Sequence, residues 1–280
     1  MTSENLLPFD PNKAADLIKQ GKIKVVTTPT PSVVALPEQP MAEDKMMERA
    51  KDILGRDFLG PEAVRTMQTK LKTVGVDVEF PIDNLPPLPY GEQDLQLAKQ
   101  NGEMLVLRAA NKRQAKSEIP LTIVDFREFF RQDPDHKLDT PFYTFRSNAN
   151  DWYPSEGFAA KPGEIQLCWT LVKKEIMKNS TDKNWSKQED LLKDYVSDLK
   201  RKGATNTEVR RRTAMEAIWD TMLYYANTGE QLLGDKYDWT NSLASNDNRV
   251  HVGAFASDGL HVNGWLPRSS REDIGVCPSR

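Results

Sequence analysis

The chain has 280 residues, 38% of them hydrophobic and 28% charged, and its formal net charge is −3. This length and composition suit a folded protein of one large domain or two modest ones. The weak negative charge argues against nucleic-acid binding, which requires a basic face. No apolar run approaches the ~18 residues of a membrane span, and the first residues lack a signal-peptide pattern. We therefore expect a cytoplasmic protein, in which Cys168 and Cys277 are too few for a disulfide framework.

The first 102 residues are expected to precede the main domain. Residues 1–42 are predicted to be flexible or extended, because prolines lack an N–H and restrict the residue before them. Apolar spacing predicts a helical region over 43–102, with helices in "EDKMMERAKDILG", after Gly60-Pro61 and in "GEQDLQLAKQNG". The intervening "NLPPLPY" fits either a plain linker or a ligand for a polyproline-binding module.

The next segments alternate between strand and helix patterns. The apolar runs in "EMLVLRA" and "GEIQLCWTLVKKEI" predict two strands, the first of them buried. Thr122 and Asp125 are expected to cap a short helix in "LTIVDFREFF". Two longer helices should follow, with capping boxes formed by Ser186 with Glu189 and by Thr205 with Glu208; the second helix should stop near Gly229.

The last 44 residues, from Tyr237, show no helical pattern. "RVHVGAF" and "GLHVNGW" flank "ASDG", which predicts a β-hairpin because Asp-Gly favours a tight turn. Side chains alternate between the faces of a strand, so four aliphatic residues should face the core: Val250, Val252, Leu260 and Val262. The opposite face should point into solvent and carry Arg249, His251, His261, Asn263 and Trp265. "DIGVCPSR" is expected to form a final strand.

A family resemblance rests on the order of several segments. "NTGEQLLGDKYDWTNS", "RVHVGAF", "GLHVNGW" and "GVCPSR" resemble the C-terminal segment of the variable proteins of diversity-generating retroelements. Upstream, "DILGRDFLGPEAV", "NGEMLVLR" and "LCWTLVKKEI" are similar to members of that group from very small, reduced bacteria. The resemblance covers roughly residues 50–280.

This resemblance implies an α+β fold: a C-type-lectin-like domain over 103–280, with short antiparallel sheets, flanking helices and a variable segment over 237–280. It also implies a ligand-binding protein without catalysis or cofactor, whose ligand is an unidentified protein. In such systems a reverse transcriptase copies a template with errors at adenines and rewrites the 3′ end of the gene. Asparagine-type codons then come to encode many residue types, while framework codons stay unchanged.

The resemblance divides the C-terminal segment into two sets of positions. The implied diversified, ligand-binding positions are Asn246, Asp247, Asn248, His251, Ala254, Ser257, His261, Asn263, Trp265, Arg268, Ser269, Ser270, Arg271 and Asp273. The implied framework positions are Trp239, Thr240, Val250, Val252, Gly253, Phe255, Gly259, Val262, Pro267, Gly275, Val276, Ser279 and Arg280.

Other readings of the same residues remain open. Cys277 with His251 or His261 and Asp273 fits a nucleophile–base–orienter set, as on a formylglycine-generating-enzyme-like or other Cys/His scaffold, but no activating motif surrounds the thiol. His251, His261, Asp258 and Cys277 lack the spacing typical of a metal site, so we expect no metal. "YDWTNS" lacks the second carboxylate that calcium-dependent lectins use as a metal ligand, so we expect neither calcium nor sugar binding.

Two further possibilities concern partners. The basic run from Lys200 to Arg212 fits either a site for phosphate or an acidic partner, or a solvated turn beside a helix C-terminus. A structural or virus-derived assembly protein is a third candidate for the whole chain.

Overall fold

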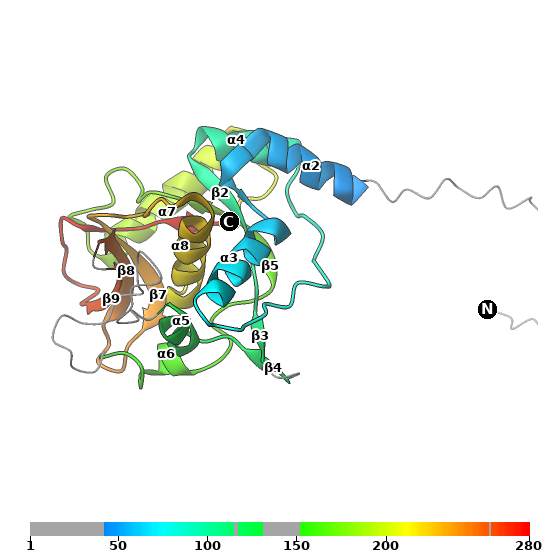
Figure 1. The fold of residues 1–280 in the computed structure, drawn as a ribbon. Coiled ribbons are helices and arrows are strands. Elements are labelled where there is room, and N and C mark those ends of the chain that lie inside the picture. Colours follow the sequence, from blue (N-terminus) through cyan, green and yellow to red (C-terminus); the bar gives the residue numbers. More distant parts are fainter. Residues whose placement is uncertain (1–41, 115–116, 131–151, 258) are drawn as a thin grey trace, which may run out of the picture. The chain divides into compact units, whose positions relative to one another are not determined.

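The computed structural model describes residues 42–114, 117–130, 152–257 and 259–280. The flexible segment expected over 1–42 lies outside the described residues except for its last position. The described residues form a mixed α+β structure in which helices surround and separate several short sheets (Figure 1). The α+β class expected from the sequence is therefore confirmed.

The first sheet joins strands from distant parts of the chain. Its order is β1-β2-β5-β11-β6, with bounds Phe58–Leu59, Glu103–Arg108, Cys168–Lys173, Pro278–Ser279 and Arg210–Arg211. The central pair, β2 and β5, is antiparallel and runs from Glu103 opposite Lys173 to Arg108 opposite Cys168. Every residue of β2 is buried, which explains the apolar run from Met104 to Leu107, and the charged residues at its two ends, Glu103 and Arg108, are paired inside the fold.

The predicted N-terminal helices are present and pack into the same hydrophobic core as the rest of the described chain. They are α2 (Ala42–Leu54), which continues into a 3-10 turn (Gly55–Asp57), α3 (Pro61–Thr73) and α4 (Glu92–Gln100). Gly60 precedes α3 and Pro61 occupies its first turn, where the missing proline N–H costs nothing. Residues 42–280 form one compact unit.

A small hairpin and two short helices follow. The hairpin pairs β3 (Asn111–Gln114) with β4 (Ser117–Pro120). Helix α5 (Ile123–Phe129) begins with the expected capping box, in which Thr122 and Asp125 each bond the backbone N–H of the other. Helix α6 spans Gly157–Ala160.

The two long helices are present, but neither uses the predicted cap. Helix α7 (Trp185–Arg201) is capped by Asn184, whose side chain accepts the N–H of Lys187. Helix α8 (Ala214–Thr228) begins with a capping box formed by Thr213 and Glu216, and it ends at Gly229, whose φ is +74°. The predicted box at Thr205 is wrong because the Thr205 N–H and hydroxyl bond Asp94 instead.

The second sheet contains the predicted C-terminal hairpin. Its order is β10-β7-β8-β9, with bounds Ile274–Gly275, Tyr237–Leu243, Arg249–Ala256 and Gly259–Trp265. Strands β8 and β9 pair antiparallel, as expected, from Arg249 opposite Trp265 to Ala256 opposite Gly259. The expected final strand is split, because β10 pairs with β7 whereas β11 joins the first sheet.

Helix α8 ties the two sheets together. It contacts β2 of the first sheet and β7 and β8 of the second, and Figure 1 shows it between them. Its Trp219 is fully buried, donates its ring N–H to the carbonyl of Leu107 at 3.1 Å, and packs edge-on against Phe80. This buried helix gives the C-terminal sheet a rigid support.

Candidate ligand-binding surface

The strand register places the C-terminal side chains in rows across β7, β8 and β9. Directly opposed residues project to the same face of a sheet. One face therefore carries three rows: Tyr237, Gly253 and His261; Trp239, His251 and Asn263; Leu243, Arg249 and Trp265. The opposite face carries Val250, Val252, Leu260 and Val262, all at most 3% exposed within the core. The predicted division of the hairpin into a core face and a varied face is confirmed.

Helix α7 and the loop after β9 cover part of the varied face. The Trp185 ring lies edge-on to Trp239 at 5.4 Å and beneath the Arg249 guanidinium at 4.8 Å. The backbone N–H of Trp185 donates to the Pro267 carbonyl at 3.0 Å, which connects the loop to the first residue of the helix. The Arg271 guanidinium then lies 4.9 Å from the centre of the Trp265 ring. Strand β9 and the outer side of the loop are left at the surface.

His251 is not on the solvent-facing surface, contrary to the sequence prediction. Its side chain is 1% exposed and lies edge-on to Tyr237 at 4.6 Å. Neither ring nitrogen has a hydrogen-bond partner among the described residues. Burial, together with nearby Arg271 and His261, lowers the pKa of His251 to about 3, so the ring is neutral at ordinary pH. Strand alternation correctly places His251 on the varied face. It cannot predict that a loop covers this part of the face, because alternation depends only on the residues of the strand.

The other predicted ligand-binding positions reach the surface. The exposed ones are Asn246, Asp247, Ser257, Asn263, Arg268 and Ser270, and the partly exposed ones are Asn248, Ala254, His261, Trp265, Ser269, Arg271 and Asp273. The register separates them between two ends of the sheet. The 246–248 turn and Trp265 lie at one end, whereas Ser257 and His261 lie at the other. They therefore form two surfaces joined by β9 and the following loop, rather than one compact patch.

The implied framework positions show the opposite behaviour. Twelve of the thirteen are buried, and Pro267 is half-buried. The Thr240 hydroxyl donates to the Val250 carbonyl at 2.8 Å and so links β7 to β8. At Gly253, an added Cβ would lie 2.2 Å from the carbonyl oxygen of Lys236, so the backbone approach permits no side chain.

Three buried polar atoms on the varied face have no hydrogen-bond partner among the described residues. They are the two nitrogens of His251 and the Trp265 ring N–H. Unpartnered buried polar atoms are rare because each one costs free energy. The Asn248 side-chain oxygen and the Ser279 hydroxyl, off this face, share that state in the described part of the chain.

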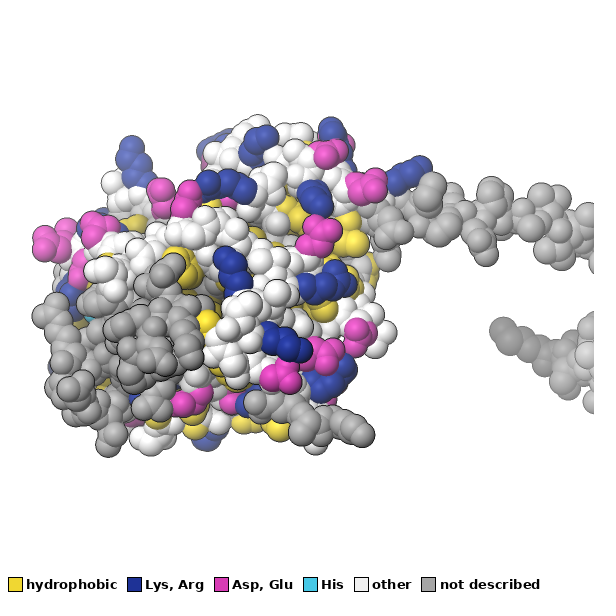
Figure 2. Space-filling view, in the orientation of Figure 1, with side chains coloured by type: hydrophobic (Ala, Val, Ile, Leu, Met, Phe, Trp, Pro, Cys, Tyr) yellow, Lys and Arg dark blue, Asp and Glu magenta, His cyan; other side chains and the backbone are white. Residues whose placement is uncertain are grey.

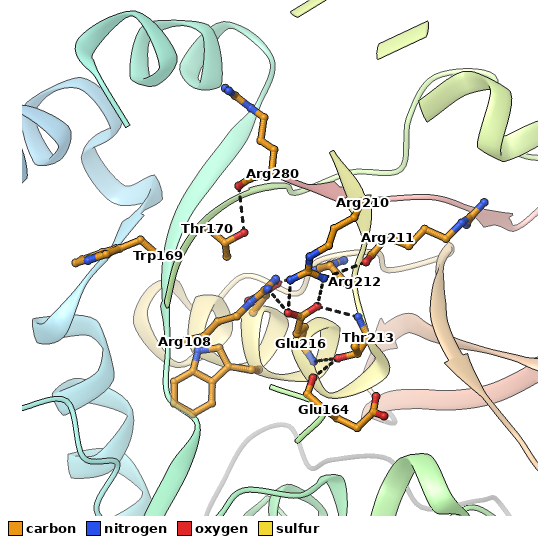
Figure 3. Close-up of polar contacts among 12 residues, drawn as sticks. Arg108, Glu164, Trp169, Thr170, Arg210, Arg211, Arg212, Thr213, Glu216 and Arg280 are labelled. Carbon is orange, nitrogen blue, oxygen red and sulfur yellow. Dashed lines mark hydrogen bonds and ion pairs between the residues drawn. The ribbon is translucent and has the colours of Figure 1, made fainter. Parts of the chain in front are cut away.

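Two arginines of the basic run, Arg211 and Arg212, are buried, whereas the Arg210 side chain is 52% exposed. Arg210 bonds Glu216, on which Arg108 also converges, whereas Arg211 points away from that carboxylate (Figure 3). Arg211 bonds Glu189 and stacks on the Trp185 ring at 3.7 Å. Arg212 is 2% exposed and pairs with two buried carboxylates, those of Asp220 and Asp238. Arg211 and Arg212 therefore join helices to sheets. Lys200, Arg201 and Lys202 are exposed at the end of α7, as the solvated-turn alternative predicts for that part of the run.

The residues of the alternative catalytic set are poorly placed for nucleophilic chemistry. Cys277 is fully buried, and burial raises the pKa of its thiol, which keeps the sulfur protonated. Its backbone N–H donates to the Asp238 carboxylate at 2.7 Å. Asp273 is paired with Arg271 at 2.8 Å. Within the described ranges, no three His, Cys, Asp or Glu side chains gather as metal ligands, and Asp258 lies outside those ranges.

On the face of the described residues drawn in Figure 2, Lys and Arg side chains are interspersed with Asp and Glu side chains. In the described part of the chain, no helix combines the length and apolar character needed to cross a membrane. Comparison of the chain with models of known protein families, with curated proteins and with solved structures gave no match.

Proposed function

We propose that this chain is a ligand-binding protein whose C-terminal surface is diversified by a retroelement and recognises a protein ligand without catalysis or cofactor. The observation that carries the proposal is the burial of the two sets of positions in residues 237–280. Thirteen of the fourteen implied diversified residues have solvent exposure, whereas twelve of the thirteen implied framework residues are buried. A gene segment that varies at the first set and keeps the second would preserve the fold.

The architecture supports the finer assignment of a C-type-lectin-like domain over residues 103–280. The resemblance implies two short sheets with flanking helices. The region contains β2 and β5 of the first sheet, the four-stranded second sheet, and α7 and α8 beside them. After the second sheet, strand β11 pairs with β5 of the first sheet. Strand pairing therefore fixes both ends of the variable segment, at β7 and at β11.

The energetics of the surface suit repeated substitution. Exposed side chains away from special contacts change stability by no more than ~0.5 kcal/mol when replaced. The core face of the same hairpin is more demanding, because Val252 is fully buried and its truncation would leave a cavity. Recognition on such a support would come from the contact area and charge of side chains such as Trp265 and Arg268.

A combined variant tests this separation. Replacing Asn246, Ser257, Asn263 and Ser270 together with residues of different size and charge should leave the unfolding free energy within about 1 kcal/mol of wild type. Val252→Ala, as the matched control in the same hairpin, should lose about 2 kcal/mol. Urea denaturation measures both. A combined variant as unstable as the control would contradict the assigned roles.

The retroelement part of the proposal is tested in the DNA that flanks the gene. We expect a reverse-transcriptase gene and a near-copy of the 3′ end of this gene, differing mainly at adenines. The differences should fall in the codons of the exposed set and spare those of the buried set. A locus that lacks either the reverse-transcriptase gene or the near-copy would overturn the retroelement part of the proposal.

A further inference from the structure

One end of the C-terminal sheet combines apolar and cationic side chains at the surface. Leu243, Arg249 and Trp265 form the last row across β7, β8 and β9. Leu266 and Arg268 follow in a turn closed by a hydrogen bond from the Ser269 N–H to the Leu266 carbonyl. We call these five residues, Leu243, Arg249, Trp265, Leu266 and Arg268, the basic sheet end.

The apolar part of the basic sheet end is unusually exposed. Leu243 is 48% exposed and Leu266 is 41% exposed, and among the described large hydrophobic residues only Ile119 is comparable. Trp265 adds a partly exposed aromatic ring. It precedes Leu266 in the chain and lies in the same row of the sheet as Leu243, with Arg249 between them. Exposed apolar side chains grouped with Trp and Arg are typical of the energetic centre of protein–protein interfaces.

The cations of the basic sheet end are not neutralised by the fold. Arg249 donates to the Asn241 carbonyl at 2.6 Å and rests on the Trp185 ring, and both of these partners are uncharged. Within the described residues, neither Arg249 nor Arg268 has a carboxylate at ion-pair distance. Two carboxylates lie beside the nearby 246–248 turn, those of Asp247 and of Glu156, which accepts the N–H and hydroxyl of Ser245. Neither carboxylate is at ion-pair distance from Arg249 or Arg268, so both guanidinium groups are left for a ligand.

A hollow adjoins this end of the sheet. Asn241, which accepts the hydrogen bond of Arg249, also lines a cavity of about 320 Å³. Leu192 and Val196 of α7 provide apolar lining. The charged lining consists of the exposed Lys193 and Arg210 and of Glu189, which is paired with the buried Arg211. The hollow is large enough to hold an apolar side chain of a partner, and the arginines lie where flanking acidic residues would meet them.

We propose that the basic sheet end and the adjoining hollow bind an acidic segment of a protein partner, with an apolar side chain of that segment seated in the hollow. The proposal rests on the proposed binding function and assigns it a ligand class. Charge complementarity selects an acidic partner, and the exposed leucines select one with apolar side chains. Two unpaired arginines on a chain of net charge −3 are too few for a nucleic-acid backbone.

Selection from a random twelve-residue peptide display library on the immobilised full chain tests this inference. Enriched peptides should contain acidic residues next to an aliphatic or aromatic residue. A synthetic peptide of the enriched sequence, measured by fluorescence polarisation, should bind the R249Q/R268Q variant about tenfold more weakly than wild type. The L243S/L266S variant should lose a similar factor. R201Q/K202Q is the matched control, because it removes two exposed charges that pair with Asp198 at the end of α7.

Two further measurements keep the result interpretable. Thermal unfolding of each variant shows whether it remains folded. If a double variant fails to fold, two other measurements replace it. The single variant Arg268→Gln must bind the peptide more weakly than wild type, and wild-type binding must weaken as the salt concentration rises. Absence of enrichment, enrichment of neutral or basic peptides, or equal binding to wild type and R249Q/R268Q would overturn the inference. A locus without a reverse transcriptase would overturn the retroelement proposal alone and leave the peptide result standing.

Discussion

Acidification is expected to destabilise this protein through His251. The ring is 1% exposed, its nitrogens have no hydrogen-bond partner among the described residues, and the Arg271 cation and His261 both act against a positive charge on it. A proton on this imidazole would therefore be buried without compensation. In the unfolded chain the same imidazole is hydrated and takes up a proton at its ordinary pKa of 6.5.

The size of the effect follows from the two pKa values. The folded pKa, about 3, lies below the unfolded value of 6.5, so the unfolded state binds more protons between these limits. Stability is therefore retained above pH 6.5 and is lost progressively as the pH falls toward 3. Between pH 8 and pH 5 the loss from this one group is about 2 kcal/mol, from 1.36 kcal/mol for each pH unit below 6.5.

Urea denaturation of wild type and His251→Leu at pH 8 and pH 5 isolates this term. Carboxylates shared by both proteins contribute equally, so the pH-dependent loss should be about 2 kcal/mol smaller in the variant. Thr240→Val is the matched control, because it removes one buried hydrogen bond on the neighbouring strand and should lower stability by about 1 kcal/mol at both pH values. Equal pH dependence in wild type and His251→Leu, or an NMR titration of the His251 ring near pH 6.5, would refute the reasoning.

Two other predictions address the interior beneath the surface. Arg212→Met should lower the unfolding free energy by about 3–5 kcal/mol in urea denaturation, because it leaves the buried Asp238 carboxylate without its paired cation, although Asp220 keeps Arg108. Arg201→Met on the solvent-exposed end of α7 should cost less than about 1 kcal/mol. Similar losses in the two variants would contradict the buried network. In the native protein an uncharged alkylating reagent should modify the half-buried Cys168 before the fully buried Cys277. Peptide mass spectrometry measures the two rates. Equally fast modification of both thiols would show that Cys277 is accessible and would make it a candidate nucleophile again.

Local patterns were sufficient to predict most elements of the fold. The continuous apolar run of β2 and the Pro61 start of α3 were read correctly because each depends on neighbouring residues alone. The caps of α7 and α8 were misplaced because several Ser, Thr and Asn side chains were available near each start. Tertiary contacts decided between them: Asp94, far away in the chain, takes both donors of Thr205 and leaves Thr213 to cap α8.

The candidate site was predictable to the same extent. Alternation correctly assigned Val250 and Val252 to the core and Trp265 to the varied face. It could not show that residues 266–273 fold back over that face, since a polar loop carries no periodic signal for its direction. Alternation alone therefore predicts that His251 faces solvent, and this prediction is wrong. The exposure of Leu243 carries no signal in the sequence, because Trp239 on the same face of β7 is fully buried.

Backbone conformation adds a limit on what the proposed diversified surface can display. Asp247 and Ala254 have φ values of 63° and 44°, in the left-handed region that most side chains avoid. Asparagine, aspartate and glycine enter this region at low cost, whereas a β-branched residue does not. Asn263 lies in the extended backbone of β9 and has no such restriction. Under the proposed function, asparagine-type template codons would encode a residue that the backbone accepts at both position 247 and position 254. Selection for folding would then keep these two positions less varied than position 263.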